Sequence, residues 1–175
     1  MLKELRKKFV DRIRHTQKID KFIPLNDMFS YGRTGNTLHM HLVPTDLRNI
    51  KSELGEEKFN EFIQNKLEDF LYRLQPIVRD DESIEELFAV SPIFFHPDWK
   101  NIHERVGFDQ IREIILEDSS SDMPYKQRLM FLQMFNKDGK NNRRVFYTNM
   151  SREKLLNTKF QKLESLQTKN ESRLV

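Results

Sequence analysis

The sequence predicts a single α/β domain with a mixed central sheet of about five strands, flanked by helices. The length of 175 residues suits one domain. Short apolar runs of strand character alternate with longer stretches of helical periodicity, which is the order typical of α/β folds. The chain has no cysteine and no apolar run near the roughly 18 residues of a membrane span. We therefore expect a cytoplasmic protein whose core forms without disulfides.

Charge is distributed unevenly along the chain. Residues 1–22 carry eight Lys and Arg against three Asp and Glu, a net charge of +5, whereas the whole chain carries +3. Apolar residues recur there at helical spacing, which predicts a basic amphipathic helix. Such a helix can bind an acidic partner, or it can pack by its apolar side and stay solvated elsewhere. We expect residues 23–166 to form the α/β domain and residues 167–175 to be a frayed tail.

The best-supported part of the prediction is a strand–helix–strand unit from Leu38 to Phe95. Residues 28–31 and 37–43 are predicted strands joined by a turn with two glycines. A short helix is expected from Thr45, followed by a long helix that Pro76 should end. The long helix has one apolar stripe, formed by Phe59, Phe62, Ile63, Leu67, Phe70, Leu71 and Leu74.

The second half of the chain continues the alternation. The apolar run 87–90 predicts a central strand covered on both faces. A helix should begin at Pro97 and end at Gly107, because proline suits a first helical turn and glycine a C-cap. The remaining predicted elements are strands at 111–116 and 144–148, a helix at 124–135, and a last helix that Ser151 caps and that carries Leu155, Leu156, Phe160 and Leu163.

The stretch Leu87–Glu113 resembles the C-terminal half of GCN5-related N-acetyltransferases. In that family a strand runs into a short helix that ends in a Tyr-Glu-x-x-Gly-Phe-like signature. The matching residues here are His103-Glu104-Arg105-Val106-Gly107-Phe108. The resemblance implies an acetyltransferase-like fold in the C-terminal half of the domain.

The same resemblance implies acyl transfer from acyl-CoA as an alternative function. The cofactor-binding candidates that it suggests are Thr45, Arg48 and Gly107. The family binds pyrophosphate with a glycine-containing turn at the start of its long helix, where main-chain amides are accessible. Here Pro44-Thr45-Asp46 stands in that place, and Asp46 would repel pyrophosphate. This departure favours a domain that binds a partner over one that turns over a substrate.

As a whole, the chain also resembles small proteins of Gram-positive bacilli described as negative effectors of ECF-type sigma factors. The residues that carry this resemblance are Phe29–Arg48 and Phe88–Phe108. It implies a non-catalytic regulatory protein whose partner is a protein, with a sigma factor as the candidate. Under this hypothesis we expect no cofactor and no catalytic residue, and nucleic acid is not the expected partner.

Histidines are the candidate metal-binding residues. His39 and His41 share one face of a predicted strand, and neutral imidazole is a common metal ligand. His96 and His103, together with Asp98, could join them if the ends of the two strands are neighbours. No third ligand lies at a recognisable spacing, so the alternative is that these histidines simply occupy a polar face. We assign no metal site.

The segment Thr37–Pro44 also resembles the strand motif of the histidine-triad nucleotide hydrolases. That motif requires His-x-His-x-His, and its first position here is Thr37. The segment leads into a long helix, which differs from that family.

Further polar and aromatic residues are candidates for lining a pocket near the strand ends. Arg48 could bind an anionic group and a histidine could act as a general base. Alternatively, Trp99 is a core anchor and the arginines are solvated. The full set of pocket candidates is Tyr31, Arg33, His39, His41, Arg48, Trp99 and His103.

Overall fold

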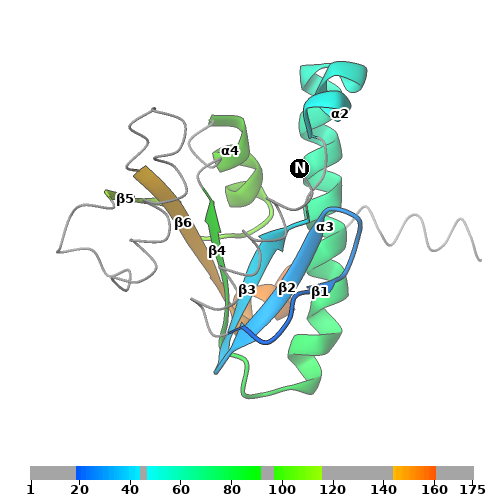
Figure 1. Cartoon of the computed structure of the whole chain (residues 1–175). Helices are drawn as coiled ribbons and strands as arrows, with labels where there is room; N and C mark the ends of the chain where they lie inside the picture. The colour runs from blue at the N-terminus through cyan, green and yellow to red at the C-terminus, as the bar shows by residue number, and fades with distance from the viewer. Residues whose placement is uncertain (1–18, 44–46, 92–96, 116–143, 161–175) are drawn as a thin grey trace, which may run out of the picture.

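The computed structural model describes residues 19–43, 47–91, 97–115 and 144–160. Most of the predicted basic helix, the predicted helix at 124–135 and the predicted tail at 167–175 lie outside these residues. The described chain forms a mixed sheet with helices packed against it (Figure 1). The predicted α/β class is therefore confirmed.

Six strands build the described sheet, in the spatial order β1-β2-β3-β4-β6-β5. Within it, β3 and β4 run parallel, and the other neighbouring pairs are antiparallel. Because β1 has two residues, five longer strands make up most of the sheet. The strands are β1 (Ile23–Pro24), β2 (Phe29–Thr34), β3 (Thr37–Leu42), β4 (Glu86–Ser91), β5 (Arg112–Ile115) and β6 (Arg144–Ser151).

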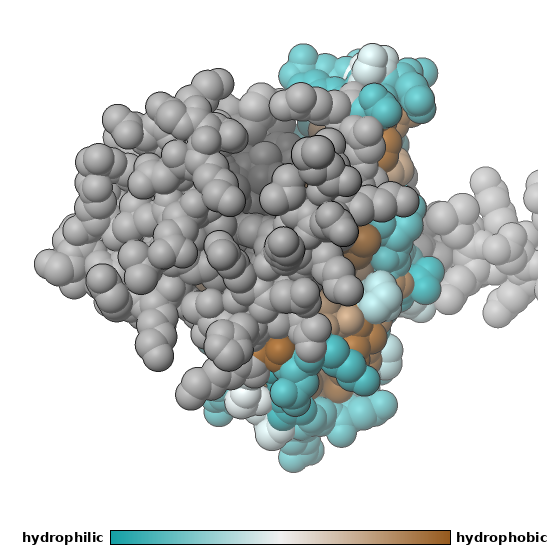
Figure 2. Space-filling model, in the orientation of Figure 1, coloured by the Kyte–Doolittle hydropathy of each residue, from teal (hydrophilic) through white to brown (hydrophobic). Residues whose placement is uncertain are grey.

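Helix α3 lies along one face of the sheet and supplies much of the core (Figure 1). The predicted apolar stripe is the buried side of this helix, and Phe70 packs against Phe29 of β2 with ring centroids 5.6 Å apart. The visible side of α2 and α3 is mainly hydrophilic, with apolar residues between the polar ones (Figure 2). The described helices are α2 (Leu47–Leu54), α3 (Glu56–Asp80), α4 (Pro97–Arg105) and α6 (Arg152–Asn157).

The two faces of the sheet differ in the residues that they present. Side chains alternate along a strand, so each strand contributes to both faces. The helix face, which contacts α3, carries Phe29, Leu38, Leu87, Ala89 and Met150, all at most 2% exposed. The other face, called the second face below, carries Gly32, His39, His41, Phe88 and Asn149.

The prediction that Pro76 ends the long helix is wrong, because α3 continues to Asp80. Pro76 is exposed and costs one main-chain hydrogen bond, while the following turn buries Val78 in the core. Arg152 also stabilises this end of the helix. Its guanidinium donates to the carbonyl oxygens of Asp81 (2.7 Å), Ile84 (3.2 Å) and Arg79 (3.4 Å). A charged donor from the far end of the chain thus binds carbonyls at the α3 C-terminus.

The last helix is shorter than predicted. Ser151 caps it as expected, since its side chain accepts a hydrogen bond from the Lys154 amide, but α6 ends at Asn157. Buried Gln75 of α3 accounts for this end. Its amide donates to the carbonyl oxygens of Leu155 (2.8 Å) and Thr158 (2.9 Å), so carbonyls at the helix end are paired with a side chain instead of a further turn.

Candidate functional site

The central feature of the sheet is a divergence between its two parallel strands. β3 and β4 are paired from Thr37↔Glu86 to Met40↔Ala89, and the pairing then stops. Both strands continue for two more residues, but β3 stays paired with β2, and β4 stays paired with β6. The two strands therefore separate toward their carboxyl ends, and Figure 1 shows the two arrows diverging. We call the region where these two strand ends diverge the slot.

Main-chain groups of β3 face the slot. The amide of Val43 donates to the carbonyl of Met28, the residue before β2, at 2.7 Å. Because main-chain groups alternate in direction along a strand, those of Leu42 point the other way, toward the β4 side. The described ladder does not continue to a pairing of His41 with Val90. The main chain of Leu42 therefore lacks the hydrogen bond to β4 that such a pairing would form. The amide of Leu42 is thus a main-chain donor that the β3–β4 ladder of the described residues does not use.

The motif His103–Phe108 forms the end of helix α4. Gly107 has φ 101°, and its amide donates to the Glu104 carbonyl at 3.2 Å. The amide of Phe108 donates to the His103 carbonyl at 3.0 Å, and the two rings lie 5.3 Å apart. This pair of bonds with its ring contact is a Schellman motif. The predicted glycine C-cap is confirmed, and helix termination alone is sufficient to explain the Gly-Phe pair.

Replacing Gly107 should destabilise the protein. A φ of 101° is strained for an L-residue, and a β-carbon would also meet Thr158 Oγ1 at 3.4 Å and Met150 Cε at 3.5 Å. We expect Gly107→Ala to lower the free energy of unfolding by about 1–3 kcal/mol, measured by urea denaturation. Gly35→Ala is the matched control, because Gly35 also has positive φ (58°) but no neighbour within 4 Å. An equal loss in both variants would contradict the greater backbone strain expected at φ 101° than at φ 58°.

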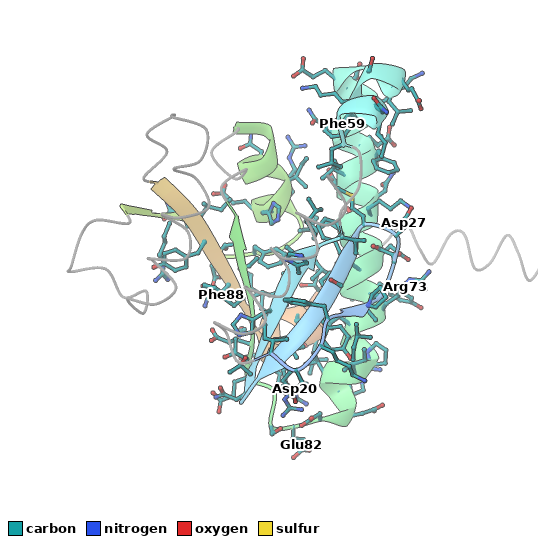
Figure 3. All side chains as sticks on the ribbon, viewed as in Figure 1. Asp20, Asp27, Phe59, Arg73, Glu82 and Phe88 are labelled. Carbon is teal, nitrogen blue, oxygen red and sulfur yellow. The ribbon has the colours of Figure 1, made fainter. Side chains whose placement is uncertain are left out.

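The two histidines of β3 lie on the second face, and their rings contact aromatic residues. His39 meets Phe88 of β4 edge to face at 5.8 Å, and Figure 3 labels Phe88 beside β4. His41 stacks on Phe22 with centroids 4.7 Å apart and an interplanar angle of 24°. Burial lowers the pKa of each histidine to about 4, although the Glu86 carboxylate raises that of His39. Both imidazoles are therefore neutral at pH 7.

Glu86 is the residue of this face that sequence reasoning missed. Its carboxylate accepts a hydrogen bond from the Thr37 hydroxyl at 3.1 Å and a long one from the Asn149 amide at 3.5 Å. These residues come from three neighbouring strands. The alternation of β4 could have placed Glu86 beside Phe88 on one face, but the partner on β6 depends on an antiparallel register that the sequence does not specify.

The structure separates the other predicted pocket residues. Tyr31 is half-buried on the helix face, and His103 is fully buried in the core beside Phe108. Arg33 is exposed at the hairpin end, opposite the slot, where it pairs with Asp81 and donates to the Ser83 hydroxyl at 2.6 Å. Hydrogen bonds from Ser83 and then from Arg33 lower the pKa of Asp81.

Several predicted residues lie outside the described parts of the structure. They are Thr45, Asp46 and His96, together with the side chains of Arg48, Asp98 and Trp99. His39 and His41 share the second face, whereas His103 belongs to the core beyond the helix face. Among the described residues, no group of three or more His, Asp or Glu side chains could hold a metal ion.

Comparisons with known proteins do not place the chain in a family. No family model, no curated protein and no solved structure matches it. None of the described helices is both long and apolar enough to cross a membrane.

Proposed function

We propose that this chain is an acetyltransferase-like domain that binds acyl-CoA in the slot between β3 and β4. The observation that carries the proposal is the end of the parallel pairing at Met40↔Ala89. A pantetheine arm contains two amides, so it can pair with main-chain groups that a neighbouring strand would otherwise use. The order of strand, long helix, strand and short helix, which carries the sequence resemblance, also supports it.

The charges near the slot suggest which part of the cofactor would contribute affinity. In the sequence, Asp46 stands directly before α2, and the first turn of α3 carries Glu56 and Glu57; each of these carboxylates would repel a pyrophosphate. Affinity should therefore come mainly from the pantetheine arm. This is the main difference from a cofactor site built on a phosphate-binding turn.

Thermal shift measurements test the proposal. At ten times its Kd, a ligand that binds the native state adds about 1.4 kcal/mol, which is a rise in Tm of roughly 3–5 °C for a domain of this size. We expect this rise with acetyl-CoA and with 4′-phosphopantetheine, but not with ADP.

Two variants locate the binding in the slot. Met40→Trp places bulk where the strands separate and should abolish the shift, while Arg33→Ala at the opposite end of the sheet should preserve it. No shift with either pantetheine compound at millimolar concentration would refute the proposal.

The regulatory interpretation of the sequence stays a prediction. It expects a sigma factor as partner, and no contact of the described residues bears on it. Its test is capture of a sigma factor by the full chain. A stable complex together with no response to pantetheine compounds would favour regulation over acyl-CoA binding.

A further inference from the structure

Residues 19–22 lie on the second face of the sheet, over Gly32 of β2 and next to His41 of β3. Ile19 is 4% exposed, and Phe22 is half-buried. A β-carbon on Gly32 of β2 would overlap Ile19 Cγ2 and would lie 3.0 Å from the Phe22 ring. These two side chains therefore rest directly on the β2 backbone. We call residues 19–22 the strap.

The main chain attaches the strap only weakly to the sheet. The strand that follows it, β1, pairs with β2 at two positions, Ile23↔Tyr31 and Pro24↔Ser30. Proline has no amide hydrogen, so this short ladder lacks a donor at one of them. Side-chain packing of Ile19 and Phe22 adds to this attachment, and Asp20 makes a further interaction.

His41 joins the strap to the slot. It is the first residue of β3 beyond the part paired with β4, and its ring stacks on Phe22. Phe22 covers one face of this half-buried imidazole, and burial is the cause of its pKa of about 4. The titratable groups around it are His39 on β3, Glu86 on β4, Tyr147 on β6, and the exposed Asp20 and Lys21 of the strap. Glu86 acts on His39.

We propose that the strap is a pH-sensitive cover of the second face, which opens when His41 takes up a proton and uncovers this histidine. An imidazolium gains hydration once Phe22 moves away, so protonation and opening favour each other. The ring of His39 instead packs edge to face against Phe88 of β4. The proposal concerns the strap itself and holds whether or not the slot binds acyl-CoA.

Linkage gives the size of the effect. If His41 has a pKa of about 4 in the closed form and its ordinary value of about 6.5 in the open form, the opening equilibrium rises about 20-fold between pH 7 and pH 5. Hydrogen exchange of peptides covering residues 19–24, corrected for intrinsic rates, measures this opening. Peptides from the buried part of α3 should stay protected at pH 5, which separates strap opening from global unfolding.

Variants on both sides of the contact test the mechanism. His41→Phe keeps the stacking but cannot take up a proton, so its strap should exchange at the same corrected rate at pH 7 and pH 5. His39→Phe is the matched control and should keep the 20-fold response. Gly32→Ala should open the strap already at pH 7. If exchange of the α3 peptides shows that Gly32→Ala is unfolded, Phe22→Ala replaces it as the variant that opens the strap. An acid response that persists in His41→Phe, or no response in the unmodified chain, would overturn the proposal.

Discussion

Acidification from pH 7 to pH 4 should lower the free energy of unfolding by about 3 kcal/mol through His39. Burial holds the pKa of His39 at about 4 in the folded protein, against 6.5 for an unperturbed histidine. Between these values the unfolded chain binds a proton that the folded chain does not. Stability is therefore complete above pH 6.5, falls as the pH decreases, and levels off below pH 4. His41 adds less to this global loss, because opening of the strap relieves its protonation.

The measurement is urea denaturation at several pH values for the unmodified chain and for His39→Phe. His39→Phe should not show the loss of about 3 kcal/mol between pH 7 and pH 4. It should also be more stable than the unmodified chain at pH 7, because Nδ1 of His39 is buried with no hydrogen-bond partner. Glu86→Gln removes the carboxylate that raises the pKa of His39. In this variant the free energy of unfolding should therefore keep falling to a lower pH than in the unmodified chain. Glu85→Gln, one residue earlier and exposed, should leave the slope unchanged. A slope that survives in His39→Phe would assign the acid sensitivity to other groups.

The strand–helix–strand unit could be predicted because its signals are local. An apolar stripe of seven residues marks α3, and the alternation in residues 37–42 marks β3. Glycine at position 107 marks the end of α4 by backbone geometry alone. Each of these signals depends on residues within one element, so no knowledge of the rest of the chain is needed.

Features that depend on two distant segments could not be predicted. The extension of α3 beyond Pro76 relies on Arg152, more than 70 residues away in sequence. The slot follows from a register in which β3 and β4 separate after Met40↔Ala89, and that register is not encoded in either strand alone. The histidine pair was found from its spacing, but the aromatic partner of His41 comes from the preceding connector.

Asn26 also links two segments that are distant in the sequence, so its role could not be predicted from local signals. Its side-chain oxygen accepts hydrogen bonds from the amides of Met28 (3.0 Å) and Phe29 (2.7 Å), which shapes the turn into β2. Its amide nitrogen donates to the Lys66 carbonyl (2.8 Å) and to Asp69 (2.9 Å) on α3. One side chain thus holds the sheet edge against the central helix, with all four of its hydrogen bonds made in a partly buried place.

Asn26→Ala should lower the free energy of unfolding by about 3 kcal/mol, because four hydrogen bonds of roughly 0.5–1.5 kcal/mol each are lost and two amides near the core lose their partner. Asn26→Asp separates the two roles, since it keeps the acceptor for the turn but brings a carboxylate against Asp69. It should be almost as destabilising at pH 7, and adding Asp69→Asn should recover part of the loss by restoring a donor–acceptor pair.

The control is Asn36→Ala, an exposed asparagine at the hairpin turn whose side chain binds Glu85, for which we expect a loss of less than about 0.5 kcal/mol. Urea denaturation of these five chains and of the single variant Asp69→Asn gives the coupling between positions 26 and 69. A coupling of zero would show that the turn, and not the link to α3, accounts for the effect of Asn26.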